Sequence, residues 1–227
     1  MSATEPLRLV IFDCDGTLVD SAHTIVAAMA ATWRAEGFDA PPSGRAVRET
    51  IGLPLVEAIA RLHPEGEVAD HHRMVACFKD SFRAVRQGPE HEEPLYPGAV
   101  EAISALEAAD VMLGVATGKS RRGLEATLGR HGLLNRFAIL KTADDGPGKP
   151  NPDILFDAMA EAGTAPETTA VVGDTVFDME MASGAGAAAI GVAWGYHDSE
   201  ELTRAGAQRI IHAFDELMPT IETLWSA

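Results

Sequence analysis

The chain has 227 residues, of which 46% are hydrophobic, and its formal charge at pH 7 is −16. This length suits one ordinary domain with a large insertion or a modest second domain, and the hydrophobic fraction is that of a globular protein with a core. The acidic balance argues against a nucleic-acid partner, and the absence of about 20 unbroken apolar residues argues against a membrane span.

The N-terminal segment and the cysteines favour a cytoplasmic protein. Residues 1–6 contain no basic and apolar signal region. The two cysteines, Cys14 and Cys77, form neither a disulfide framework nor a metal-ligand spacing. Cys14 is interpreted as a small buried residue, because the sequence places no His or Asn to activate a thiol nucleophile.

Branched and aromatic residues at 7–12 predict a buried strand of a parallel sheet, and acidic residues follow it directly. Because side chains alternate along a strand, Asp13 and Asp15 leave on the same side, and Gly16 lets the chain turn sharply. A buried carboxylate pair is costly unless a cation or a shared proton relieves the repulsion, so a function is expected here. The alternative is a solvated strand end and an ordinary turn.

Residues 19–93 show only helical patterns. Apolar residues recur at helical spacing over 21–36, with Ser21 as the expected cap. Further helices are expected at 44–50, from Pro54 onward and at 67–85. A polar linker at 87–94 then leads back to the sheet.

From about residue 95, helices alternate with short apolar strands. Helices are expected at 98–109, 120–131, 153–163 and 177–184, and strands at 111–116, 137–140, 170–172 and 188–192. This alternation predicts an α/β fold, a doubly wound parallel sheet with helices on both faces. The helical block is then an insertion after the first strand.

Two later segments carry groups that suit an anion. The strand at 111–116 runs into Thr117-Gly118-Lys119-Ser120, whose backbone amides and helix start can hold an anion, although Ser120 is equally an ordinary helix cap. Lys149 lies in a rigid turn between two prolines, so it is positioned rather than free in solvent.

A second carboxylate pair, Asp174 and Asp178, follows the strand at 170–172. Either residue alone could be a helix cap or a first-turn acid. In a doubly wound sheet, however, ligands bind beyond the carboxyl ends of the strands, where the loops converge. The carboxylates suit Mg²⁺, and with Lys149 they suit transfer of a phosphoryl group through an aspartyl phosphate.

Four ordered motifs together resemble the haloacid dehalogenase superfamily of hydrolases. They are residues 13–21, 117–119, 148–152 and 173–178, and the match covers the chain from end to end. The helical block resembles the small cap of the phosphoglycolate phosphatase-like branch. The resemblance implies a core domain of residues 1–18 and 94–227 and a helical cap domain of residues 19–93.

The resemblance also implies a role for each motif residue. Asp13 would be the nucleophile and a Mg²⁺ ligand, and Asp15 the general acid and base with its main-chain carbonyl on the metal. Lys149 would act in catalysis and in phosphate binding. The remaining phosphate-binding positions would be Cys14, Thr117 and Gly118, and the remaining metal positions Asp174 and Asp178.

The implied function is a Mg²⁺-dependent phosphatase of a small phosphomonoester, with 2-phosphoglycolate as the first candidate. Asp15 favours phosphorus over carbon chemistry, because a dehalogenase needs no acid there. Alternatives are a pyrophosphatase, a nucleotide or sugar-phosphate phosphatase, a phosphomutase, or a regulatory module that binds a phosphorylated metabolite. The oligomeric state stays open between monomer and dimer.

Closure of the cap is expected to exclude water, with hinges at 18–20 and 94–97. The break at 51–54 presents backbone to the substrate or is an ordinary inter-helix turn. A substrate carboxylate would need a cation, for which the candidates are Arg45, Arg48, Lys79, Arg83 and Arg86.

Overall fold

The computed structural model describes residues 6–88 and 92–226. Two sequence predictions extend beyond these residues: the absence of a signal region at 1–6, and the polar linker at 87–94, which includes residues 89–91. The outermost ends of the predicted core domain also lie outside the described residues.

The centre of the molecule is a six-stranded parallel sheet with the order β3-β2-β1-β4-β5-β6. Its strands are β1 (Leu9–Phe12), β2 (Met112–Ala116), β3 (Ile139–Lys141), β4 (Thr169–Gly173), β5 (Ala188–Val192) and β6 (Arg209–Ile211). The order reverses at β1, which makes the sheet doubly wound and confirms the predicted fold class.

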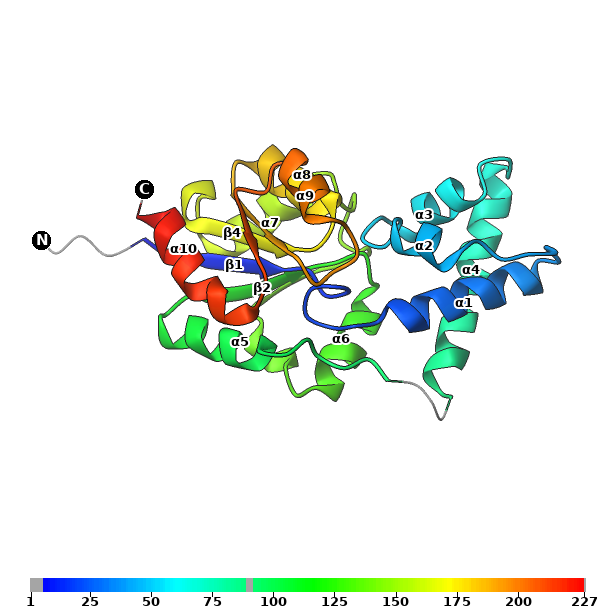
Figure 1. The fold of residues 1–227 in the computed structure, drawn as a ribbon, viewed down its shortest axis with the longest axis horizontal. Helices are drawn as coiled ribbons and strands as arrows, with labels where there is room; N and C mark the ends of the chain where they lie inside the picture. Colours follow the sequence, from blue (N-terminus) through cyan, green and yellow to red (C-terminus); the bar gives the residue numbers. More distant parts are fainter. Residues whose placement is uncertain (1–5, 89–91, 227) are drawn as a thin grey trace, which may run out of the picture.

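Helices cover both faces of this sheet (Figure 1). One face packs on α5 (Ala99–Ala108), α6 (Arg121–Arg130) and α10 (Leu217–Trp225), and the other on α7 (Asp153–Ala162), α8 (Val176–Ala185) and α9 (Ser199–Arg204). Among the described residues, the connections around the sheet also contain three short 3-10 helices, η1 (Leu134–Arg136), η2 (Pro166–Thr168) and η3 (Phe214–Glu216). The central strands β1 and β4 are buried on both faces, which explains their continuous apolar sequences.

Four helices between β1 and α5 form a separate layer, called here the helical block. They are α1 (Ala22–Ala35), α2 (Gly44–Arg48), α3 (Leu55–Leu62) and α4 (Val68–Arg86). They share an apolar cluster of their own that includes Met29, Trp33, Ile59 and Met74. The block lies beside the carboxyl end of the sheet, on the side away from α10 (Figure 1).

The two chain segments that join the block to the sheet run side by side. Asp20 donates its amide to the Pro94 carbonyl at 2.9 Å, and Tyr96 donates to the Leu18 carbonyl at 3.0 Å. Val19 and Leu95 form an antiparallel bridge between them. Within the described part of the predicted linker, Glu93 is buried, and its carboxylate lies 3.1 Å from the guanidinium of Arg86.

Besides the short η1 and η2, the structure adds four elements after residue 192 that the sequence analysis did not predict. They are α9, β6, the 3-10 helix η3 and α10. β6 is a three-residue edge strand whose first residue, Arg209, is exposed, so it carries little of the apolar pattern that marks the central strands. Within residues 6–88 and 92–226, no helix is both long and apolar enough to cross a membrane.

Candidate active site

The carboxyl ends of β1, β2 and β4 bring three motifs together. The Asp13 amide donates to the Val172 carbonyl at 2.9 Å, which sets the end of β1 beside the end of β4. In the strand register Phe12 lies opposite Val115 on one side and Val172 on the other. Asp13, Thr117 and Asp174 therefore leave three adjacent strands at one edge of the sheet.

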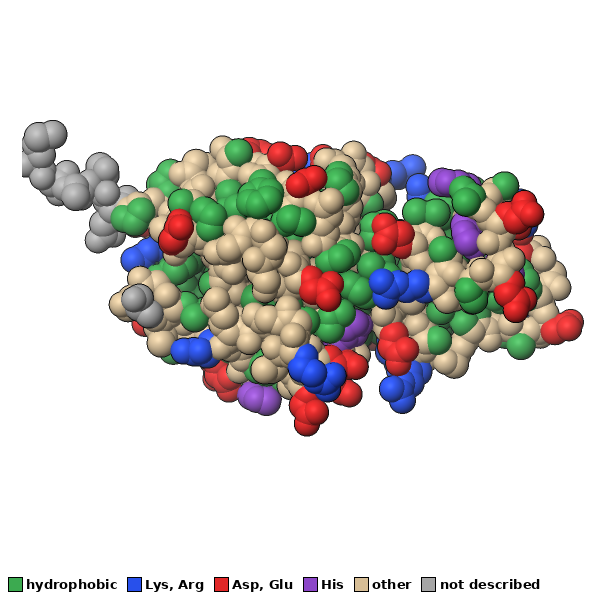
Figure 2. Space-filling view, turned by 90° about the horizontal axis from the view of Figure 1, so that it is seen from above, with side chains coloured by type: hydrophobic (Ala, Val, Ile, Leu, Met, Phe, Trp, Pro, Cys, Tyr) green, Lys and Arg blue, Asp and Glu red, His purple; other side chains and the backbone are tan. Residues whose placement is uncertain are grey.

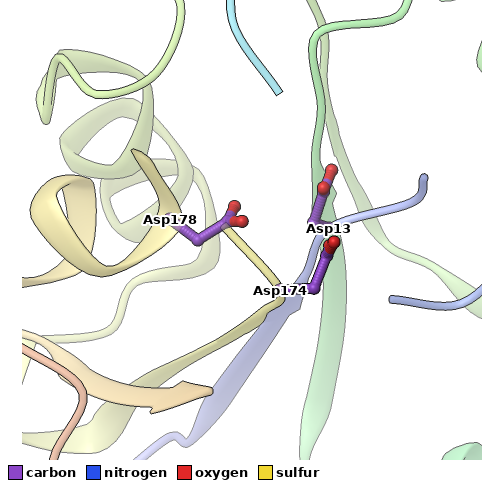
Figure 3. A group of neighbouring side chains, drawn as sticks. All are labelled: Asp13, Asp174 and Asp178. Carbon is purple, nitrogen blue, oxygen red and sulfur yellow. The ribbon is translucent and has the colours of Figure 1, made fainter. Parts of the chain in front are cut away.

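Three carboxylates gather at this edge. Asp13, Asp174 and Asp178 are all buried, and one oxygen from each lies within 4.8 Å of the others. Figure 3 shows Asp13 and Asp174 side by side at the strand ends, with Asp178 reaching toward them from α8. Such a cluster is unfavourable without cations, because burial in a low dielectric strengthens the mutual repulsion.

Lys149 supplies one of those cations. Its Nζ lies 2.8 Å from Asp13 Oδ1 and 2.6 Å from Asp178 Oδ1, and its side chain is 1% exposed. The other oxygen of Asp178, Oδ2, accepts hydrogen bonds from the amide and hydroxyl of Thr175. Asp178 therefore orients Lys149 and is itself fixed by the first turn of α8.

Asp174 is held by donors from two distant segments. The Thr17 hydroxyl donates to Oδ1 at 2.9 Å and the Tyr196 amide donates to Oδ2 at 2.9 Å. Glycines leave room for this carboxylate: a Cβ on Gly16, where φ is +90°, would lie 2.2 Å from Asp174 Oδ2, and one on Gly195 would lie 2.0 Å from Asp174 Cβ. Both positions exclude a side chain.

Burial sets the protonation behaviour of the cluster. Burial raises the pKa of Asp13 to about 7. The positive charge of Lys149 opposes this shift, and the negative charges of Asp178 and Asp15 add to it. Burial and the charges of Asp13 and Asp178 also raise the pKa of Asp174. The same carboxylates keep the pKa of Lys149 above its usual value against the effect of its own burial, so this Lys stays protonated.

Asp15 lies apart from the cluster and has partners of its own. Ser21 donates its hydroxyl to Asp15 Oδ1, and the Nζ of Lys119 lies 2.8 Å from the same oxygen. Ser21 occupies the predicted N-cap position of α1, but its hydroxyl makes no capping bond and donates to Asp15 instead. The sequence analysis named Lys119 within its motif but gave it no role.

The predicted anion-binding turn follows β2. The Thr117 hydroxyl accepts a hydrogen bond from the Lys119 amide at 3.3 Å, so its own proton can be donated to another group. Ser120 is the predicted helix cap, since its hydroxyl accepts from the Gly123 amide. The Cys14 side chain is fully buried in the apolar core, and burial raises the pKa of its thiol, which agrees with a packing role for this side chain.

The helical block reaches into this edge of the sheet through the turn between α2 and α3. A Cβ on Gly118 would lie 3.0 Å from the Leu53 carbonyl oxygen, and one on Gly148 would lie 2.7 Å from the Pro54 ring. Leu53 also packs on Phe177 of α8. The structure therefore places the 51–54 break against two of the motifs, with backbone at Gly118 and the Pro54 ring at Gly148, and the block covers the strand ends.

The five cationic candidates for a substrate carboxylate are arranged differently. Arg86 pairs with Glu93 and donates to the Thr127 hydroxyl at 3.3 Å. Two others, Arg45 and Arg83, form exposed ion pairs within their own helices. The side chains of Arg48 and Lys79 are exposed. Figure 2 shows positively and negatively charged side chains on the surface where the helical block adjoins the rest of the molecule.

Comparisons with known proteins agree with this arrangement. Residues 10–192 match the family described as haloacid dehalogenase-like hydrolase. The chain is 36% identical over 220 residues to the "probable phosphatase IndB" of Dickeya dadantii, covering 95% of this chain and 94% of the relative. It is 28% identical to the phosphoglycolate phosphatase of Synechococcus elongatus, covering 96% and 99%.

A solved structure of a hydrolase from Pseudomonas syringae superposes with a TM-score of 0.83 at 27% identity, covering 95% of this chain and 98% of that one. This likeness extends over both the sheet and the helical block. All three relatives are therefore similar to the present chain over nearly their full lengths.

Proposed function

The chain belongs to the family of haloacid dehalogenase-like hydrolases, and from that premise we propose that it is a Mg²⁺-dependent phosphatase of small phosphomonoesters. The observation that carries the proposal is the buried trio Asp13, Asp174 and Asp178 with Lys149 bridging two of its members. A carboxylate nucleophile needs cations beside it to approach a phosphate dianion.

The donor set fits a small divalent cation. Asp13 Oδ2 is buried and accepts no hydrogen bond from the described residues. The carboxylate oxygens of Asp174 and Asp178 lie near it, and an all-oxygen set of this kind suits Mg²⁺. We propose that Asp13, Asp174 and the main-chain carbonyl of Asp15 hold the ion directly. Asp178, whose oxygens already bind Lys149 and Thr175, would act through water. When bound, Mg²⁺ would neutralise charge on the phosphoryl group.

Asp13 is proposed as the nucleophile. Its carboxylate attacks phosphorus and forms an aspartyl phosphate as the bond to the leaving oxygen breaks. Lys149, held protonated by Asp13 and Asp178, stays in place to neutralise the phosphoryl oxygens. Around the phosphoryl group, the Thr117 hydroxyl and the main-chain amides of Cys14 and Gly118 would complete its binding site.

Asp15 is proposed as the general acid and base. It gives a proton to the leaving oxygen in the first step and, as its conjugate base, takes a proton from the water that hydrolyses the intermediate. Its separate environment, with Ser21 and Lys119 as donors, distinguishes it from the carboxylates that surround Asp13. Two carboxylates with different surroundings can take different roles in one reaction.

The helical block, residues 19–93, is proposed as a cap domain over a core of residues 1–18 and 94–227. Its contacts with Gly118, Gly148 and Phe177 correspond to a closed state that shields the phosphoryl group from water. The paired segments at 18–20 and 94–97 are the proposed hinges, since they are the two connections that a rigid movement of the block must bend.

Small phosphorylated metabolites are the proposed substrates, with 2-phosphoglycolate as the first to test. The relative from Synechococcus elongatus is named phosphoglycolate phosphatase, which supports this choice. Among the five predicted cap cations, those with described pairings contact other protein groups, so they do not single out a substrate carboxylate. A cytoplasmic location stays a prediction from the sequence.

The alternatives differ in what they release. A pyrophosphatase or a phosphatase of nucleotides or sugar phosphates would prefer another member of a substrate panel. A phosphomutase would bind a bisphosphate tightly and release phosphate slowly. A regulatory module would bind its ligand without turnover, although a sensor has no need of the nucleophile and the general acid and base that Asp13 and Asp15 would provide.

The test is phosphate release from a panel of 2-phosphoglycolate, pyrophosphate, nucleotide monophosphates and sugar phosphates, with Mg²⁺ and with chelator. We expect turnover that requires Mg²⁺ and is lost in Asp13→Asn. Asp157→Asn, a change of the same kind on the exposed side of α7, is the matched control and should keep full activity. Ligand binding without turnover in the wild type would contradict the proposed phosphatase.

A further inference from the structure

Lys119 lies where the sheet, the Asp15 carboxylate and the helical block meet. Its Nζ is 2.8 Å from Asp15 Oδ1 and 5.4 Å from the centre of the Phe82 ring on α4. Only 8% of its side chain is exposed. Burying an ammonium is unfavourable unless its partners are well placed, so this position requires both the carboxylate and the surrounding wall.

Both donors to Asp15 bind the same oxygen. The Ser21 hydroxyl and the Lys119 ammonium act on Oδ1 from different segments of the chain. With Oδ1 engaged twice, Oδ2 is the oxygen that can carry a proton to the leaving group. Two donors on one oxygen also restrict rotation of the carboxyl group. Ser21 and Lys119 together therefore hold the carboxyl group of Asp15 by one oxygen.

The helical block supplies one wall of the Lys119 site. Phe82 presents its ring to the ammonium, and an ammonium gains more from an aromatic face when water is excluded. If the block moves away, Lys119 regains water and its attraction to Asp15 weakens in the higher dielectric. The closed arrangement thus favours the oriented form of Asp15.

We propose that Lys119 is a positioning residue for Asp15 and that closure of the helical block completes its site through Phe82. The inference rests on the proposed phosphatase function, since it concerns the proton that Asp15 gives to the leaving oxygen. It makes the correct orientation of the general acid depend on the closed state.

The first test compares two esters that differ in their need for an acid. p-Nitrophenyl phosphate has a leaving group that departs without a proton, whereas benzyl phosphate requires one. Lys119→Met keeps the length of the side chain and removes its charge. General acid catalysis contributes roughly 10²–10⁴-fold, so kcat/KM for benzyl phosphate should fall by about 10-fold or more while that for p-nitrophenyl phosphate changes by less than about 3-fold.

Controls make this comparison specific. Asp15→Asn should show the same selectivity between the esters with a larger loss. Lys141→Met removes another largely buried ammonium, one that pairs with Glu161 at 3.0 Å, and should change neither ester. An equal loss of kcat/KM on both esters in Lys119→Met would overturn the positioning role. Absence of wild-type turnover on both would instead contradict the phosphatase proposal.

The second test needs no turnover. Lysines of the intact protein are acetylated with acetic anhydride and the labelled peptides are quantified by mass spectrometry. Lys119 should be labelled several-fold faster in Asp15→Asn and in Phe82→Leu than in the wild type, with Lys141 as the internal reference. Unchanged labelling of Lys119 in both variants would refute the proposal whatever the activity shows.

Discussion

Replacing the proposed nucleophile should make the metal-free protein more stable. Burial raises the pKa of Asp13 from 3.8 to about 7. This shift of about 3 units, at about 1.4 kcal/mol per unit, corresponds to up to about 4 kcal/mol for ionising the carboxyl in the folded protein. Asp13→Asn removes that cost and replaces the unpartnered Oδ2 by an amide that can donate to the neighbouring carboxylates.

The gain should be smaller than this ceiling and should depend on pH. Asp13→Asn weakens the contact with Lys149, so we expect a net increase of about 2 kcal/mol in the free energy of unfolding. Because the pKa of Asp13 is raised in the folded state, the wild type binds more protons folded than unfolded between about pH 4 and 7. Its metal-free stability therefore falls as the pH rises through this range, and the advantage of Asp13→Asn grows until about pH 7.

Urea unfolding followed by circular dichroism measures this effect, at pH 5 and pH 8, each with chelator and with Mg²⁺. Excess Mg²⁺ at about 100 times its Kd adds about 2.7 kcal/mol to a protein that binds it only when folded, so it should cancel or reverse the advantage of Asp13→Asn. Asp157→Asn, the control, should leave the free energy of unfolding unchanged both with chelator and with Mg²⁺. An advantage equal at both pH values, or a variant less stable than the wild type at pH 8 in chelator, would refute the reasoning.

Three further predictions concern the packing around the site. Gly195→Ala should abolish Mg²⁺-dependent activity and lower the free energy of unfolding by about 2 kcal/mol, because its Cβ would lie 2.0 Å from Asp174 Cβ; a phosphate assay and urea unfolding test both. Glu93→Gln should lower the free energy of unfolding by about 3 kcal/mol, because the largely buried guanidinium of Arg86 loses its carboxylate partner; unchanged urea unfolding would contradict this. In a thiol-reagent titration of the native protein, the cysteine on α4 should react and Cys14 should not until urea is added, because burial raises the pKa of the Cys14 thiol and excludes the reagent.

The sequence by itself determined the architecture and the residue types of the site. Apolar runs and helical periodicity are local signals, so they predicted β1, β2, β4 and β5 and the helices between them within a few residues. The motifs that follow β1, β3 and β4 identified Asp13, Lys149, Asp174 and Asp178 before any geometry was known. Parallel strands force their carboxyl ends to one edge, so topology alone implied that these groups converge.

Only the tertiary structure determined which side chains of the site contact one another. Ser21 is the N-cap residue of α1, as its position in the sequence predicts, yet its hydroxyl donates to the Asp15 carboxylate, which the turn after β1 brings within reach. The partners of Lys119, a carboxylate from β1 and a ring from α4, come from distant parts of the chain. Contacts of this kind depend on how whole elements pack, and no local pattern records them.

Two further features could not be predicted from the sequence for the same reason. They are the requirement for glycine at position 195 and the edge strand β6. Gly195 is required by Asp174, which lies 21 positions earlier in the chain and approaches it only when β4 and β5 pair. β6 is recognisable because its residues pair with β5, although its own sequence is short and half polar. The sequence thus determined which groups are present, and the long-range packing of the sheet and the helical block decided their orientation and their partners.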